Sequence, residues 1–167
     1  MCAIAGAVAL SEALAPAAAD AVARMSARMA ARGPDGAGLA RLSDGAAVLA
    51  HRRLAIIDPS PAAAQPMTDA TGRWTLVFNG EIYNYVELRA ELAAAGRRPV
   101  GAGDAGTLLA CIAEWGEAGL ARLRGMYAFA LWDAREQELW LCRDPFGIKP
   151  LYYAQAGDAL FFASQAR

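Results

Sequence analysis

Strand-like stretches fall into two groups along this chain, and stretches with the apolar spacing of amphipathic helices lie between them. The strand-like stretches are residues 4–8, 46–50, 54–57, 74–78, 126–133, 138–143, 151–153 and 160–162. The expected helices cover about 15–31, begin at 85 and at 104, and include a short one near 120–124. This order indicates an α+β fold, in which antiparallel sheets stack as a sandwich with helices packed against them.

Length and composition exclude several classes of protein. The 167 residues suit a single domain, covering 1–167, and the formal net charge of −1 offers no basic face for nucleic acid. Three widely spaced cysteines favour a reducing compartment over a disulfide framework. The apolar N-terminus lacks the basic residues of a secretion signal, and no apolar run approaches the roughly 20 residues that a membrane span needs. We expect a cytoplasmic protein with no nucleic-acid or membrane partner.

Cys2 is the first candidate for chemistry. An initiator methionine is trimmed when the next side chain is small, so the mature chain would begin with a thiol and a free α-amine on one residue. An α-amine with a pKa of about 7.7–8.0 accepts a proton near neutral pH, and a cysteine is a strong nucleophile. The alternative is that Cys2 is only a small apolar packing residue.

Three polar residues, His51, Arg52 and Arg53, interrupt the apolar stretches. In an extended chain Arg52 and Arg53 point to opposite faces, so one of them faces the interior. A buried guanidinium needs a negative partner, which implies a buried acid or a carboxylate ligand, unless the pair is simply solvated at a strand end. His51 is the only histidine, and the residues around it favour a structural role over a catalytic triad.

The strand at 74–78 runs directly into Asn79 and Gly80. Asn-Gly on its own predicts a type I′ hairpin turn. The continuation favours a helix instead, with Asn84 as the N-cap and Glu87 as its capping partner. A strand that ends in Asn-Gly before a helix brings a side-chain amide and an approachable backbone N–H to one place, as an oxyanion hole requires.

Other local signals predict structure rather than chemistry. Asp104 reads as the N-cap of a helix that ends at Gly116, and the stretch 33–36 reads as a tight turn. Cys111 and Cys142 lie within apolar stretches and are predicted to be inert thiols.

These motifs together resemble one family, the glutamine-hydrolysing asparagine synthetases, and specifically their N-terminal class II glutamine amidotransferase domain. The matching segments, in order, are Met1-Cys2, Arg32-Gly33-Pro34-Asp35-Gly36, residues 51–58, Gln65-Pro66-Met67, residues 78–84, residues 125–130 and residues 143–153. The resemblance covers essentially the whole chain. It implies an N-terminal nucleophile hydrolase, a four-layer αββα sandwich of two antiparallel sheets.

The resemblance also implies a role for each site residue. Cys2 would attack the carboxamide of glutamine, while the Asn79 side chain and the Gly80 N–H hold the oxyanion. Arg53 would bind the substrate α-carboxylate, with Glu81 and Asp104 receiving the α-ammonium group. Main-chain groups of Leu54, Ile56 and Ile57 would complete the pocket. No metal or cofactor is implied here, since ATP and Mg²⁺ belong to the family's synthetase domain.

The sequence also departs from the family's usual pattern. Asp104 lies within Gly103-Asp104-Ala105-Gly106, without the usual neighbouring hydroxyl and carboxylate, which predicts a looser helix start and weaker glutamine binding. Ala3 replaces a Gly or Ser, and Gln165 stands where Glu is usual. The Ser-Gly-Gly-Xaa-Asp-Ser loop of the ATP-dependent synthetase domain does not occur in these 167 residues.

Three interpretations follow. The first is a glutaminase domain that supplies ammonia to a C-terminal or separate ATP-dependent synthetase domain, which amidates aspartate or another carboxylate. The second is a catalytically silent scaffold, as in β-lactam synthetase-like relatives. The third is an N-terminal nucleophile hydrolase for another amide, which the paired arginine and acidic groups disfavour because they fit a free amino acid. The resemblance is compatible with a homodimer, and the sequence leaves the oligomeric state open.

Overall fold

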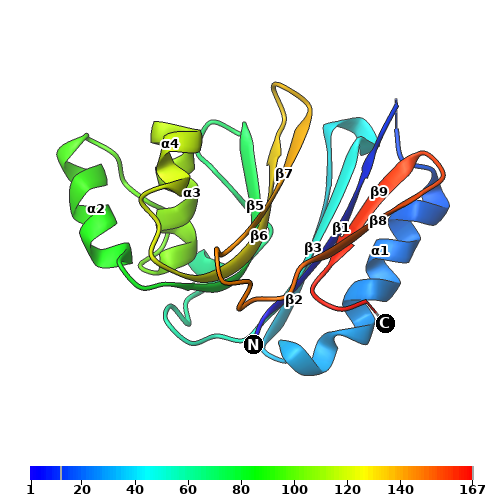
Figure 1. Ribbon diagram of the computed structural model, residues 1–167, viewed down its shortest axis with the longest axis horizontal. Helices are drawn as coiled ribbons and strands as arrows, with labels where there is room; N and C mark the ends of the chain where they lie inside the picture. The colour runs from blue at the N-terminus through cyan, green and yellow to red at the C-terminus, as the bar shows by residue number, and fades with distance from the viewer. Residues whose placement is uncertain (12, 167) are drawn as a thin grey trace.

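The computed structural model describes residues 1–11 and 13–166, and its strands form two antiparallel sheets that face each other (Figure 1). The first sheet has the order β2-β3-β1-β9-β8, with β1 Ala3–Ala9, β2 Gly36–Leu42, β3 Ala47–Arg53, β8 Tyr152–Ala156 and β9 Ala159–Ala163. The second has the order β4-β5-β6-β7, with β4 Met67–Thr68, β5 Trp74–Ile82, β6 Gly125–Asp133 and β7 Glu138–Arg143.

Helices cover the outer face of each sheet. α1 (Pro16–Arg28) packs on the first sheet, and α2 (Tyr85–Ala94), α3 (Asp104–Trp115) and α4 (Glu117–Leu120) lie beyond the second (Figure 1). Short 3-10 turns occur at Ala30–Arg32, Ser43–Gly45 and Pro61–Ala63. The four layers confirm the predicted αββα sandwich. Two helix limits were wrong: the first helix ends at Arg28 rather than near 31, and the short helix covers Glu117–Leu120 rather than 120–124. None of the helices in the described ranges is long and apolar enough to span a membrane.

The alternation of side chains along each strand divides the core. In β1, Ala3, Ala5 and Ala7 pack under α1, and their small side chains let the helix lie close to the sheet. Ile4 and Val8 point the other way, into the layer between the sheets. In β5, Val77 faces this same layer, while Leu76, Phe78 and Ile82 pack against α2 and α3. The parity of a residue therefore decides which layer its side chain enters.

Strand β5 does not turn at Asn79-Gly80. It continues to Ile82, and Gly80 pairs with Tyr127 and Glu81 with Met126 of β6. The prediction that the strand ends at Asn-Gly was therefore wrong, because β6 supplies a partner for every residue up to Ile82. Gly80 has a packing reason as well, since a Cβ there would overlap the Met126 carbonyl oxygen.

Two predicted helix caps differ in the structure. Asn84 is the N-cap of α2 but makes no capping bond; its Nδ2 donates to the Arg122 carbonyl at 3.0 Å and its Oδ1 accepts from the Arg124 N–H at 2.9 Å. The capping box with Glu87 is therefore absent, and Asn84 instead ties α2 to the segment before β6. Gly103, not Asp104, is the N-cap of α3.

The strand predicted at 54–57 was wrong: β3 ends at Arg53, where its pairing with β1 and β2 also ends, and residues 54–57 form a loop. The predicted end of the second long helix is confirmed. Gly116 ends α3 with a positive φ of 56°, a conformation that glycine adopts without strain. Burial raises the pKa of Cys111 to about 12 and that of Cys142 to about 11, which agrees with the prediction that these thiols are unreactive.

Candidate active site

The N-terminus lies at one end of the layer between the sheets (Figure 1). Polar side chains gather at this end. Strand parity explains why. Cys2 shares its face with Ile4, and Arg53 shares its face with Leu49, so both belong to the inner face of the first sheet. On β5, Asn79 and Glu81 have the parity of Val77, which lies in the same layer. Residues far apart in sequence thus meet between the sheets.

A cavity of about 180 Å³ opens at this end. All nine site residues predicted from the sequence line it: Cys2, Arg53, Leu54, Ile56, Ile57, Asn79, Gly80, Glu81 and Asp104. The side chain of Ile56 is mostly exposed, which places it at the rim. Met1, His51, Asp58, Gln65 and Lys149 also line the cavity. The structure brings the nine residues together, and their individual roles remain predictions.

The Cys2 thiol is held by the main chain of Leu54. The Leu54 N–H donates to Sγ at 3.3 Å, and Sγ lies 3.6 Å from the Leu54 carbonyl oxygen. Arg32 Nε donates to the Cys2 carbonyl at 3.2 Å. Cys2 is half-buried, so its sulfur is fixed in position yet open to a ligand in the cavity.

Asn79 is 2% exposed, and its Nδ2 has no hydrogen-bond partner within the described ranges. A buried donor left unpaired costs about 1–3 kcal/mol, so native proteins rarely retain one without a reason. Because Asn79 lines the cavity next to Cys2, a bound acceptor atom would satisfy it. The unpaired amide therefore points to a ligand oxygen at this place.

The Gly80 N–H lies on the free edge of β5. Backbone groups of alternate residues face the same edge of a strand. The Phe78 N–H on this edge donates to Gln65 Oε1 at 2.6 Å, and the Ile82 N–H donates to Asp104 Oδ2 at 3.0 Å. Gly80 lies between them, beyond the Met67–Leu76 pair that is the nearest point of β4. Its N–H therefore faces away from β6 and is open to a ligand.

The two arginines of β3 separate as the strand alternation predicted. Arg52 points to α1, where its Nε donates to the carbonyl and hydroxyl of Ser26 at 3.0 and 3.1 Å. Arg53 faces the cavity, and its Nη2 donates to the carbonyls of Asp58 at 2.5 Å and Ser60 at 2.8 Å. Within the described ranges neither guanidinium pairs with an acid, so Arg53 is the one whose charge a carboxylate ligand in the cavity could meet.

Two acids form the other wall. Asp104 is 7% exposed, and burial raises its pKa even though the Ile82 N–H donates to its carboxylate. The nearby charge of Glu81 raises this pKa further. Two neighbouring carboxylates, one of them buried, would be stabilised by a cation placed against them. The cavity thus presents positive charge on one side and negative charge on the other.

The start of α3 is packed more closely than its sequence suggested. A Cβ on Gly106 would overlap the Val100 carbonyl, and one on Gly103 would lie 2.9 Å from the Cβ of Asp58. The loop before the helix can therefore pack directly on it because these two residues lack side chains. The α3 N-cap has no side-chain capping bond, and the predicted loosening of the helix start and weakening of glutamine binding both stay predictions.

Three ionisable side chains that line the cavity were not predicted as part of the site: those of His51, Asp58 and Lys149. His51 is 1% exposed, and its Nε2 donates to the Phe78 carbonyl at 3.1 Å. Burial lowers its pKa to about 4, so the ring is neutral at pH 7 and its predicted structural role is confirmed. Asp58 and Lys149 sit at the ends of sequence motifs, and nothing local in the sequence distinguishes them from turn residues. Among the described residues, no group of three or more His, Cys, Asp or Glu could hold a metal ion.

Comparison with known proteins decides the family. The model of the glutamine amidotransferase domain family matches residues 1–167. The chain belongs to this family. Glutamine-hydrolyzing asparagine synthetase 1 of Bacillus subtilis (strain 168) is 42% identical over 136 residues, which cover 81% of this chain and 21% of that protein. Asparagine synthetase B of Escherichia coli (strain K12), also named glutamine-hydrolyzing, is 40% identical over 138 residues, which cover 81% and 24%.

A solved structure confirms the fold of this amidotransferase domain. Glutamine phosphoribosylpyrophosphate amidotransferase from B. subtilis, complexed with ADP and GMP, superposes with a TM-score of 0.79 at 22% identity. The match covers 97% of this chain and 41% of that one. The predicted resemblance to the amidotransferase domain of asparagine synthetases is thus confirmed. The chain spans about a fifth to a quarter of the length of the two relatives it matches.

Proposed function

We propose that this amidotransferase domain hydrolyses glutamine to glutamate and ammonia through a thioester on Cys2. The observation that carries the proposal is the buried, unpaired Nδ2 of Asn79 in the cavity that the Cys2 thiol also lines. A nucleophile and an unoccupied hydrogen-bond donor in one cavity are the two parts that acyl transfer from an amide needs.

The chemistry requires a processed N-terminus. With Met1 removed, the Cys2 α-amine would take the thiol proton while the sulfur attacks the side-chain carbonyl carbon of glutamine. The oxyanion would accept hydrogen bonds from Asn79 Nδ2 and the Gly80 N–H. The amine would then pass its proton to the departing nitrogen, releasing ammonia and leaving a thioester. Water activated by the same amine would cleave the thioester to glutamate and restore the thiol.

Charge on the two walls supports glutamine as the substrate. The α-carboxylate would meet the Arg53 guanidinium, whose planar fork suits a carboxylate. The α-ammonium group would meet Glu81 and Asp104, and its charge would offset the crowding of those two acids. Main-chain groups of Leu54, Ile56 and Ile57 would line the remaining wall. A simple amide lacks both charges and would leave these groups unpaired, which disfavours a hydrolase for other amides.

The role in a whole protein follows from the relatives. We propose that the ammonia passes to an ATP-dependent synthetase domain, on the same chain or on a partner chain, that amidates aspartate or a related carboxylate. ATP and Mg²⁺ would bind there, and this domain would need no cofactor. A free nucleophilic thiol fits the reducing cytoplasm. A homodimer remains an expectation from the resemblance.

The decisive experiment combines mass spectrometry of the N-terminus with a glutamate-release assay. We expect Met1 to be absent, glutamine to be hydrolysed, and Cys2→Ala to abolish turnover without unfolding the domain. Cys142→Ala is the matched control, because that thiol has a raised pKa and does not line the cavity. Retained Met1 with no glutamate release would favour the silent scaffold. Unchanged turnover in Cys2→Ala would exclude the assigned nucleophile.

Arg53→Ala gives a second test of the substrate. It should raise KM for glutamine much more than it lowers kcat, because it removes a binding contact remote from the reacting carbonyl. Arg53 also holds the carbonyls of Asp58 and Ser60. Asp58→Ala loosens the same loop by removing the acceptor of the Ser60 and Ala102 N–H groups, and it leaves the Arg53 side chain in place. An unchanged KM in Arg53→Ala would exclude this residue from the glutamine pocket.

A further inference from the structure

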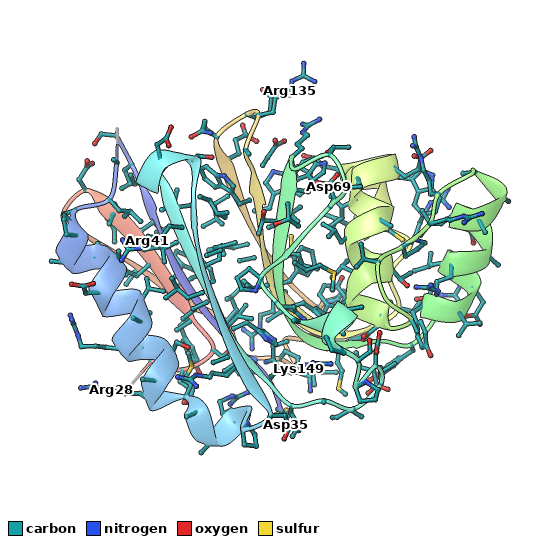
Figure 2. All side chains as sticks on the ribbon, turned by 180° about the vertical axis from the view of Figure 1, so that it is seen from behind. Arg28, Asp35, Arg41, Asp69, Arg135 and Lys149 are labelled. Carbon is teal, nitrogen blue, oxygen red and sulfur yellow. The ribbon has the colours of Figure 1, made fainter. Side chains whose placement is uncertain are left out.

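Lys149 is the only lysine of the chain, and it is buried in the cavity that holds Cys2. It is 6% exposed, and it lies at the same end of the molecule as Asp35, between the two sheets (Figure 2). Its Nζ lies 3.2 Å from the Met1 sulfur, and no ion pair joins it to an acid among the residues described. Burying an ammonium group whose contact is a thioether costs free energy. We therefore expect the positive charge of Lys149 to have a function.

The loop that carries Lys149 is held firmly in place. The Asp144 carboxylate accepts the N–H groups of Phe146, Ile148 and Lys149 at 2.9–3.1 Å. Arg143 donates from Nε to the Lys149 carbonyl at 2.7 Å and from Nη2 to the Gly147 carbonyl at 2.6 Å. These bonds fix the backbone on both sides of Lys149, so its side chain remains directed into the cavity.

The contact with Met1 disappears when the initiator is removed. Five covalent bonds separate the Met1 sulfur from the Cys2 nitrogen, and Lys149 and Cys2 line the same cavity, so Nζ and the new α-amine share that cavity. That amine must be neutral to accept the thiol proton, as the proposed function requires. A nearby positive charge disfavours the protonated amine.

We propose that Lys149 is a positioning residue that keeps the Cys2 α-amine in its neutral, proton-accepting form. The inference rests on the proposed glutaminase activity and adds a residue to it. Other charged or titratable groups face the same region from the surrounding elements: Arg32, His51, Arg53, Asp58, Glu81 and Asp104. His51 is neutral, and the acids favour the protonated amine. Lys149 offsets the acids from the side of the cavity that Met1 vacates.

The test compares Lys149→Met, which keeps the length of the side chain, with Lys149→Arg, which keeps the charge. In Lys149→Met the acidic limb of the pH profile of kcat/KM should move to higher pH by about one unit, the size expected for two like charges several ångströms apart in a partly solvated site. Near neutral pH, kcat/KM should fall by up to about tenfold. Lys149→Arg should keep the wild-type profile. A loss of activity at every pH without a shift would indicate a merely structural role and overturn the proposal.

A second readout does not depend on turnover. In the processed chain the Cys2 α-amine and Lys149 are the only primary amines, so acylation of the N-terminal peptide can be followed cleanly by mass spectrometry against pH. The midpoint should rise by about one unit in Lys149→Met. An equal midpoint in wild type and Lys149→Met overturns the role of Lys149. Absence of wild-type turnover contradicts the proposed function, and the amine titration still decides the effect of Lys149.

Discussion

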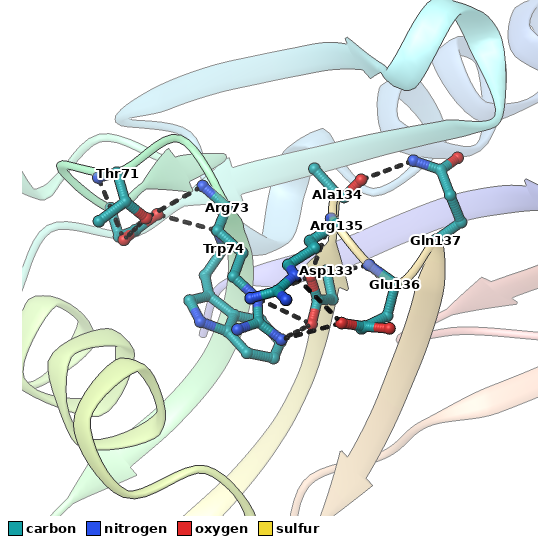
Figure 3. Close-up of polar contacts among 9 residues, drawn as sticks. Thr71, Arg73, Trp74, Asp133, Ala134, Arg135, Glu136 and Gln137 are labelled. Atoms are coloured by element: carbon teal, nitrogen blue, oxygen red, sulfur yellow. Dashed lines mark hydrogen bonds and ion pairs between the residues drawn. The ribbon is translucent and has the colours of Figure 1, made fainter.

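Buried polar groups are hydrogen-bonded near the start of strand β5, and a buried amide near its other end is not, within the part of the chain that the structure describes. At its start, the Asp133 carboxylate accepts bonds from Nε and Nη2 of Arg73 at 2.5–3.1 Å and from the Arg135 and Glu136 N–H groups at 2.9 and 3.3 Å (Figure 3). The Arg73 guanidinium also lies over the Trp74 ring, 4.5 Å from its centroid. At the other end, Asn79 Nδ2 has no partner among the described residues. The polar groups at one end of β5 are paired within the protein, and the Asn79 amide at the other end is the donor that the proposed function assigns to the substrate.

Two aspartates show the same contrast. Burial alone would raise the pKa of Asp133, but the bonds from Arg73 and two backbone N–H groups outweigh it and lower the pKa. Burial also raises the pKa of Asp104, where the Ile82 N–H offsets only part of the effect and Glu81 adds to it. A structural acid has its charge compensated within the protein, whereas an acid in a binding site lacks that compensation until the substrate arrives.

The largest effect is expected for Asn79→Ala. If the unpaired amide serves the oxyanion, kcat should fall by about 10²- to 10³-fold. The free energy of unfolding should hardly change, because Nδ2 makes no hydrogen bond in the folded domain. Glutamate release and urea unfolding measure the two effects. A wild-type kcat together with a large loss of stability would reverse the assignment of this end of β5.

His51 differs from Asn79 because it lines the same cavity but has a hydrogen-bond partner, the Phe78 carbonyl. Its folded pKa of about 4 lies below the ordinary value of 6.5, so the unfolded chain binds a proton that the folded one does not. The contribution of neutral His51 to the free energy of unfolding should be fully present above pH 6.5. The free energy of unfolding should fall by up to about 3 kcal/mol as the pH drops to about 4. His51→Gln retains a donor to the Phe78 carbonyl and should flatten this dependence, measured by urea unfolding at pH 4.5 and 7. An equally steep loss in the variant would contradict it.

Asp133→Ala tests the paired end. It leaves Arg73 and two backbone N–H groups without their acceptor, so Tm should fall by roughly 5 °C or more. The kinetic constants for glutamine should stay at wild-type values, since Asp133 does not line the cavity. Asp133→Asn, which keeps an acceptor oxygen, should lose less stability. A changed KM for glutamine would show that the two ends are coupled.

The smallest effect is expected for Asp58→Ala. Hydrogen bonds from Ser60 and from the Ala102 N–H lower the pKa of Asp58 to about 2. The ionised carboxylate therefore links two segments that line the cavity at every pH above about 4. This link is lost as the pH falls towards 2 and the carboxylate is protonated. The variant should raise KM for glutamine by a few-fold and leave Tm nearly unchanged, because the loop is exposed. Steady-state kinetics and thermal unfolding measure the two effects. A large drop in Tm would show that Asp58 stabilises the fold and not only the cavity.

The sequence by itself determined the layers and the candidate nucleophile. The alternation of apolar residues within strands and their helical spacing elsewhere are local signals, repeated often enough to predict two sheets with helices outside. The same alternation predicted that the side chains of Arg52 and Arg53 point to opposite faces, and this depends on neighbours within a few residues. Seven segments spread along the chain, from Met1-Cys2 to residues 143–153, carried the resemblance to the amidotransferase domain.

Tertiary structure decided what the local signals could not. Asn79-Gly80 is a strong turn signal, yet β6 pairs with it and β5 continues; Asp104 resembles an N-cap, yet its carboxylate accepts the Ile82 N–H. Lys149 enters the site from a loop 147 residues after Cys2. Local preferences amount to about 1 kcal/mol or less, and hydrogen bonds and burial supplied by distant segments exceed them. Which polar atoms are paired, and which remain free for a substrate, is therefore visible only in the folded chain.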